Sequence, residues 1–274
     1  MSRTERRENV VCPRFVAAVL GGLGLVLLAA PSVALEPPIA RTELKSGSAF
    51  VSAEVRAMQG DDFANPGMLW VTRGERLWRE PAGTTSKSCA SCHSDAASSM
   101  KGVATRYPRI DPAAARLMNL EGRINECRSS NQGATPLAYE SDELLALTAY
   151  VTYQSRGMPM NVSVDAQNTR EFERARSLFN RRIGQMNLAC AQCHDRNWGR
   201  TLFHEKLSQG HGTAFPTYRL EWQTLGSLQR RIRACYSGLR AEMPPYGARE
   251  LVELELYLGW RSNGLAIETP GVRR

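Results

Sequence analysis

Hydrophobic residues form one long uninterrupted run in this chain, close to its beginning. The sixteen-residue run FVAAVLGGLGLVLLAA covers 15–30, follows a segment that carries four arginines, and precedes the small residues SVA at 32–34. A basic segment, an apolar stretch and small residues at a cleavage position are typical of a secretory signal peptide. The run is short for a membrane span. We therefore predict that residues 1–34 are a signal peptide that is removed, and that the mature chain is exported and has no membrane span.

Beyond this run, apolar residues recur at helical intervals, and their pattern occurs twice. LW at 77–78 lies at the same distance before a short cysteine motif as LF at 178–179 before a second one. Further along, ELLALTAYV at 143–151 matches ELVELELYL at 250–258 position for position. Matched segments with a helical period indicate a duplicated helical unit.

The two cysteine motifs of the repeat are CASCH and CAQCH, both of the form CxxCH. Two thiols at this spacing on the first turn of a helix can form thioethers to one haem, and the adjacent histidine then binds the iron. A zinc site would need a second cysteine pair nearby, and a redox dithiol would not need the histidine twice. The sequence predicts two covalently bound c-type haems, attached through Cys89, Cys92, Cys190 and Cys193, with His93 and His194 as axial ligands.

Each half reads as a helix, a haem motif, a loop with a lone cysteine, and a terminal helix. This is the order of a class I cytochrome c domain. We predict a mainly α protein with two tandem class I cytochrome c-like domains related by duplication. After an N-terminal extension (35–70), the first domain covers 71–160 and the second 161–274, with the boundary in the polar, proline-containing stretch at 157–168.

Charge narrows the choice of partners. The formal net charge is +8 at pH 7, of which four arginines and two glutamates place +2 in the predicted signal. A basic chain outside the cytoplasm favours acidic partners or small anions. No basic stripe with interleaved aromatic residues is present, so we do not predict nucleic acid as a partner.

The second axial ligand of each iron is suggested by comparing the halves. Met243 stands where ordinary class I cytochromes have a methionine ligand, but its counterpart, counted from the lone cysteines, is Thr135. The halves share instead a cysteine with an arginine four residues earlier, Arg123 or Arg231. We therefore predict thiolate ligation of the two irons by Cys127 and Cys235, which would lower their reduction potentials.

Other interpretations of these residues stay open at this point. An even cysteine count in an exported chain is compatible with a Cys127–Cys235 disulfide, and both thiols could be buried and inert. Met243 remains an alternative ligand of the second haem. His204 and His211 occur only in the second half and are expected to lie in loops or on a partner surface.

Several long stretches resemble the SoxA family, the dihaem cytochrome subunits of the periplasmic Sox sulfur-oxidation system. They are PLAYESDELLALTAYVTYQSRGMPM (136–160), NLACAQCHDRNWG (187–199), GTAFPTYRLEWQ (212–223) and RRIRACYSGLRAE (230–242). The resemblance implies an L-cysteine S-thiosulfotransferase that forms a heterodimer with the monohaem cytochrome SoxX and joins thiosulfate to a cysteine of the carrier SoxYZ. It also implies His/Cys ligation of both haems, Cys235 as the catalytic sulfur, present as a persulfide, and Arg231 as the substrate-binding residue.

Two other functions use the same residues. A dihaem electron carrier without substrate chemistry would use Met243 as a ligand and would tolerate loss of Cys235. A thiosulfate dehydrogenase making tetrathionate would need no carrier protein and would turn over with thiosulfate and an electron acceptor alone.

Overall fold

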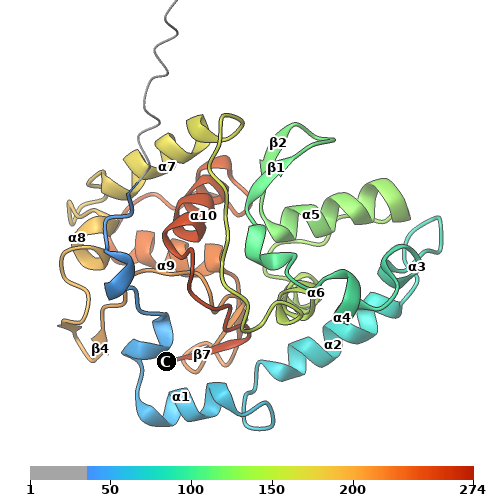
Figure 1. Ribbon diagram of the computed structural model, residues 1–274, viewed down its shortest axis with the longest axis horizontal. Helices are drawn as coiled ribbons and strands as arrows, with labels where there is room; N and C mark the ends of the chain where they lie inside the picture. Colours follow the sequence, from blue (N-terminus) through green and yellow to red (C-terminus); the bar gives the residue numbers. More distant parts are fainter. Residues whose placement is uncertain (1–35) are drawn as a thin grey trace, which may run out of the picture. The chain divides into compact units, whose positions relative to one another are not determined.

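Two helix pairs organise residues 36–274, the part of the chain that the computed structural model describes (Figure 1). In the first half, α2 (Met68–Arg79) packs against α6 (Asp142–Tyr153). In the second half, α7 (Thr169–Asn180) packs against α10 (Arg249–Arg261). The helix-rich fold confirms the predicted mainly α class. The predicted signal peptide, 1–34, lies outside the described residues.

Small residues let the helices of each pair approach closely. A Cβ atom on Gly74 of α2 would come within 2.1 Å of the Ala146 carbonyl oxygen in α6, so a larger side chain would push the helices apart. The matching position of α7 holds Ala175, which is fully buried. Around these contacts the apolar faces of the four helices form two cores, whose largest members include Trp78, Leu145, Tyr150, Phe172, Phe179 and Tyr257.

The two lone cysteines lie on helices and not in the loops that the sequence predicted. Cys127 ends α5 (Leu120–Cys127), and Cys235 lies in α9 (Leu228–Gly238). Each helix follows a polar N-cap residue whose side chain accepts a hydrogen bond from the backbone N–H three residues later. Their many charged residues concealed these helices in the hydrophobic pattern. The helical spacing places the arginine four residues earlier on the same face as each cysteine.

Short strands lead into the cysteine helices, and the mainly α prediction did not include them. In the first half, β1 (Arg109–Asp111) pairs antiparallel with β2 (Arg116–Met118). In the second half, β5 (Thr217–Arg219) pairs antiparallel with β6 (Thr224–Gly226). The C-terminal strand β7 (Gly271–Arg273) adds in parallel to the other edge of β5. Each strand pair thus lies directly before the helix that carries the lone cysteine.

The remaining elements are short. They are the 3-10 helices η1 (Arg41–Glu43), η2 (Gly47–Phe50) and η3 (Ala104–Arg106), the π-helical turn η4 (Arg128–Gln132), the helices α1 (Ala53–Gly60), α3 (Cys89–His93), α4 (Ala96–Ser99) and α8 (Cys190–His194), and the hairpin of β3 (Thr201–Leu202) and β4 (Glu205–Lys206). Within residues 36–274, no helix has the length and apolar character needed to cross a membrane.

The segment between the two halves is irregular but anchored. It pairs with residues near the C-terminus: Ile267 N–H donates to the Met158 carbonyl at 2.9 Å, and Met160 N–H donates to the Leu265 carbonyl at 2.9 Å. Pro37–Arg274 accordingly form one compact unit. The domain limits 71–160 and 161–274 stay predictions that rest on the sequence repeat.

Candidate active site

Each CxxCH motif forms a single helical turn, α3 or α8, with a capping contact at its start. The Ser88 hydroxyl accepts a hydrogen bond from Ser91 N–H at 3.1 Å. In the second motif, Ala189 N–H donates to the side-chain oxygen of Gln192 at 2.8 Å. These contacts hold the chain helical from the first cysteine onward, so that two thiols three residues apart lie on one side of the turn.

A backbone carbonyl orients the histidine of the second motif. His194 Nδ1 lies 2.8 Å from the Ser208 carbonyl oxygen, and because that oxygen can only accept, Nδ1 carries the proton. The other ring nitrogen, Nε2, is then free to bind a metal. Gly210 has a φ of +75°, and a Cβ atom there would come within 2.9 Å of the His194 ring. A glycine at this place lets the loop come close enough to supply the carbonyl.

Cys235 lies against this histidine. Burial alone would raise the pKa of the Cys235 thiol, but a hydrogen bond with His194 and the charges of Arg231, His194 and Arg219 outweigh it and lower the pKa to about 7. The negative charge of Cys235 in turn raises the pKa values of Cys190 and Cys193, after the larger effect of burial. The structure therefore brings together the predicted attachment cysteines, the histidine and the lone cysteine of the second half.

The first half places Cys127 in a different electrostatic setting. Burial raises the pKa of its thiol; the charge of Arg123 opposes this rise, whereas the charges of Asp111, Glu126 and Cys92 add to it. Arg123 itself is committed to a carboxylate, since its Nη1 lies 2.7 Å from Oδ2 of Asp111. The two lone cysteines thus lie on equivalent helices but among different charges.

Both sites have the donors that a c-type haem requires. Each offers two thiols on one helical turn, an adjacent imidazole and a further cysteine, which suits two thioethers and two axial iron ligands. All six cysteines of the described chain are free, so the alternative of a Cys127–Cys235 disulfide is wrong. Each half also buries guanidinium nitrogens without a hydrogen-bond partner among residues 36–274, Nε of Arg128 and Nε and Nη1 of Arg261. Such donors suit the carboxylates of a haem.

Three arginines precede the lone cysteine on α9. Among the described residues, the side chains of two of them have a stacking or hydrogen-bond partner, and the third has no ion pair. Arg230 stacks on Trp222, with its guanidinium carbon 4.1 Å from the ring centre. Arg233 donates to the Pro244 carbonyl oxygen. Arg231 forms no ion pair within the part of the chain that the structure describes. Its guanidinium is therefore available to an anion beside the sulfur.

Sequence reasoning missed a second arginine of this site, Arg219 at the end of β5. Its side chain is 7% exposed, and its Nε atom has no hydrogen-bond partner among the described residues. Burial and then the charge of Arg231 lower the pKa of Arg219, and the charge of Arg219 contributes to the lowered pKa of Cys235. Comparison of the halves could have found it, because the residue sixteen positions before the lone cysteine is Asp111 in one half and Arg219 in the other.

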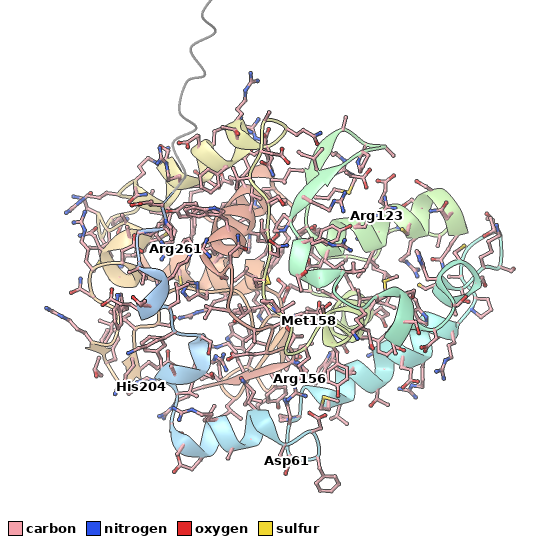
Figure 2. All side chains as sticks on the ribbon, in the orientation of Figure 1. Asp61, Arg123, Arg156, Met158, His204 and Arg261 are labelled. Atoms are coloured by element: carbon pink, nitrogen blue, oxygen red, sulfur yellow. The ribbon has the colours of Figure 1, made fainter. Side chains whose placement is uncertain are left out.

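Met243, His204 and His211 are placed less favourably than Cys235 for binding the second haem iron. Met243 lies in the loop between α9 and α10 and is 46% exposed, which favours Cys235 as the ligand. His204 lies exposed on the turn between β3 and β4 (Figure 2). His211 lies in the loop between β4 and β5, as expected, but it is buried there and not on a surface, 3.1 Å from Ser262 Oγ. Burial, followed by the charges of Arg261 and His194, lowers its pKa to about 3, so it is neutral.

Known proteins share this sequence and architecture. Residues 73–160 match the family described as SoxA/TsdA, cytochrome c domain. The L-cysteine S-thiosulfotransferase subunit SoxA of Pseudaminobacter salicylatoxidans is 44% identical over 84% of this chain and 80% of its own length. The same subunit of Rhodovulum sulfidophilum is 36% identical over 84% and 80%. The crystal structure of SoxXA from P. pantotrophus matches with a TM-score of 0.81 at 35% identity, covering 84% of this chain and 86% of that one.

Proposed function

Because the chain belongs to the SoxA family, we propose that it is the subunit of an L-cysteine S-thiosulfotransferase that couples thiosulfate oxidatively to a cysteine thiol of a carrier protein. Its curated relatives are named as subunits of that enzyme. As a cytochrome c of this family it carries covalently bound c-type haem. Activity and cofactor together define a redox enzyme whose substrates are sulfur compounds.

The reaction joins two sulfur atoms and releases two electrons. A bond forms between the terminal sulfur of the thiosulfate dianion and the sulfur of the carrier cysteine, and the thiol loses its proton. The sum balances, since the thiosulfate dianion and a neutral thiol give a thiosulfonate monoanion, one proton and two electrons. Bound haem would supply one-electron redox chemistry for removing these electrons, and a partner cytochrome would receive them.

The observation that carries this proposal is that Cys235 and His194 lie together beside Arg231, which has no ion pair among residues 36–274. With a pKa lowered to about 7, Cys235 has a large thiolate fraction at neutral pH, and a thiolate or persulfide is a soft nucleophilic sulfur. The planar guanidinium of Arg231 can hold a sulfonate through two parallel hydrogen bonds. We assign Cys235 as the catalytic sulfur that holds the thiosulfate sulfur until the carrier thiol displaces it, and Arg231 as the substrate-binding residue.

The same proposal assigns the haem ligands. In the first half Cys89 and Cys92 would attach the haem, and His93 and Cys127 would bind its iron. In the second half Cys190 and Cys193 would attach the haem, and His194 and Cys235 would bind its iron. His194 is held ready by the Ser208 carbonyl, which keeps the proton on Nδ1. A thiolate ligand at both irons would lower their reduction potentials.

The relatives support a proposal for the partners and the location. The matched structure is of a SoxXA assembly, and we propose that this chain likewise pairs with a SoxX-like monohaem cytochrome. A SoxYZ-like protein would supply the thiol and thiosulfate the sulfur, in the periplasm. The basic charge of the chain suits an anionic substrate.

Replacement of Cys235 by alanine tests the assignment. We expect both haems to attach and thiosulfate-dependent coupling to be lost, as measured by intact mass and by electron transfer to the partner cytochrome. Cys127→Ala is the matched control, since it removes the equivalent cysteine of the first half and should leave coupling in place. Full coupling by Cys235→Ala would refute the catalytic assignment, and turnover of thiosulfate without any carrier would point to tetrathionate formation. An extra mass of about 32 Da, lost on reduction, would identify the persulfide.

A further inference from the structure

The two halves carry opposite charges at one equivalent position. Asp111 is the last residue of β1 and pairs with Arg116 of β2, whereas Arg219 is the last residue of β5 and pairs with Thr224 of β6. The two strand pairs have the same register. Each of these residues lies sixteen positions before the lone cysteine and twelve before the arginine on the cysteine helix. Position, register and spacing therefore agree, and only the sign of the charge differs.

In the first half, this position neutralises the arginine beside the cysteine. Asp111 Oδ2 lies 2.7 Å from Arg123 Nη1, and the Asp111 side chain is 7% exposed. Its other oxygen, Oδ1, accepts hydrogen bonds from Ala113 N–H at 3.0 Å and Ala114 N–H at 2.9 Å. The carboxylate is thus held firmly in place, and Arg123 (Figure 2) faces a fixed negative charge. An incoming anion would have to displace or oppose that charge.

In the second half, the same position adds a positive charge. Arg219 is buried, its Nε atom has no partner among the described residues, and its Nη2 atom is 3.6 Å from Oε1 of Glu205 and from Oε2 of Glu221. Both distances exceed a normal hydrogen bond, and both carboxylates are on partly exposed side chains. Burying a cation close to a second one is unfavourable unless an anion lies between them. The arrangement of Arg219 and Arg231 is therefore complementary to a doubly charged oxyanion.

We propose that this one position decides which half of the molecule accepts the substrate anion. Asp111 prevents the anion from binding in the first half, because its carboxylate already pairs with Arg123. In the second half Arg219 joins Arg231 in holding the sulfonate of thiosulfate beside Cys235. The inference rests on the proposed function for the identity of the anion. It explains why two halves with the same cysteine and the same arginine would differ in activity.

The first test replaces Arg219 in the dihaem protein paired with its partner cytochrome. The guanidinium carbon of Arg219 lies 5.1 Å from the centre of the Trp222 ring. Arg219→Met keeps a long side chain and removes the charge, whereas Arg219→Lys keeps the charge without the planar fork. Loss of one charge-assisted contact should raise KM for thiosulfate about 10-fold to 100-fold while kcat changes little, with partial recovery in the lysine variant. A KM equal to that of the unaltered protein in Arg219→Met would overturn the role of Arg219.

The second test removes the negative charge that pairs with Arg123 in the first half. Asp111→Asn retains Oδ1 for the Ala113 and Ala114 N–H groups and removes the negative charge from Arg123. Calorimetric titration of the dihaem protein with thiosulfate, in the absence of carrier and electron acceptor, should show one site in the unaltered protein and two in the variant. Asp142→Asn, which makes the same charge change at an exposed residue of the first half, should still show one site. One site in Asp111→Asn, or two in the unaltered protein, would refute the inference.

These readouts separate the inference from the proposed function. If the unaltered protein binds one thiosulfate and couples none to a thiol, the proposed function fails, and the site count in Asp111→Asn still decides the role of Asp111. If coupling proceeds and the Arg219 and Asp111 variants both behave as the unaltered protein does, the proposed function stands and the inference falls.

Discussion

Replacing Glu121 by glutamine should stabilise the protein at neutral pH and do so much less in acid. Glu121 on α5 and Glu255 on α10 are 8% and 5% exposed, and both line a cavity of about 90 Å³ between the two halves. Oε2 of Glu255 has no hydrogen-bond partner among residues 36–274. Two buried carboxyl groups that influence each other cannot both ionise cheaply. Burial raises the pKa of Glu121 to about 7, against a backbone hydrogen bond that lowers it and with a smaller contribution from the charge of Glu140. Burial and then the charge of Glu121 raise the pKa of Glu255.

The sign of the effect follows from proton binding. The folded chain keeps the Glu121 proton up to about pH 7, whereas the unfolded chain loses it near the ordinary value of 4.5. Between these values the folded state binds more protons, so its stability falls as the pH rises, and above about pH 7 the loss is complete. The shift corresponds to a destabilisation on the order of 3 kcal/mol at most. Glutamine stays neutral at every pH, and Glu121→Gln removes this loss.

Thermal unfolding of the dihaem protein at about pH 5 and about pH 8 measures the difference. In a domain of this size, 1 kcal/mol moves Tm by roughly 2–4 °C, so Glu121→Gln should raise Tm by several degrees at the higher pH and clearly less at the lower. Glu80→Gln makes the same chemical change at an exposed residue and should shift Tm little at either pH. A gain that is equal at both pH values, or a variant less stable than the parent at about pH 8, would refute the reasoning.

Three further changes test the packing and the ligand set. Gly74→Ala places a methyl group within 2.1 Å of a carbonyl oxygen in α6 and should lower the free energy of unfolding, measured in urea, by about 1–3 kcal/mol. Gly60→Ala, where a Cβ atom would meet no heavy atom of the described residues within 4 Å, should not lower it. Arg174→Met leaves the buried Glu253 carboxylate with the exposed Arg249 as its one ion-pair partner among the described residues. It should lower the free energy of unfolding by about 2–4 kcal/mol, and a second change, Glu253→Gln, should reduce this loss. Met243→Leu should leave the absorption spectrum of the second haem and the coupling rate unchanged, whereas a methionine ligand would make both change.

Much of the site could be predicted from the sequence, because its chemistry is local. Thioether attachment requires two thiols at a fixed spacing on a helical turn, with a histidine next to them. This spacing can be recognised directly in the amino-acid sequence. The repeat was also visible, and it singled out Cys127 and Cys235 over Met243. The loops expected around these cysteines were wrong, since α5 and α9 are helices whose charged residues conceal their period.

The charge around each cysteine could not be predicted in the same way. Arg123 and Arg231 occupy the same place in two similar helices, and their sequence neighbours gave no reason to treat them differently. What separates them is the residue at one strand position, which is Asp111 in the first half and Arg219 in the second. His211 illustrates the same limit, because its burial against Ser262 depends on segments that are distant along the chain.

The sequence by itself therefore determined where haem can attach, which residues are candidate ligands, and that the chain is helical and repeated. Those properties depend on short-range spacing and on helical period. Only the tertiary structure decided that Arg231 has no ion pair in the described part of the chain, that Arg219 lies beside it, that Asp111 pairs with Arg123, and that two buried carboxyl groups share one cavity. The physical reason is that electrostatic energy and desolvation depend on distance through space, which folding sets and sequence separation does not.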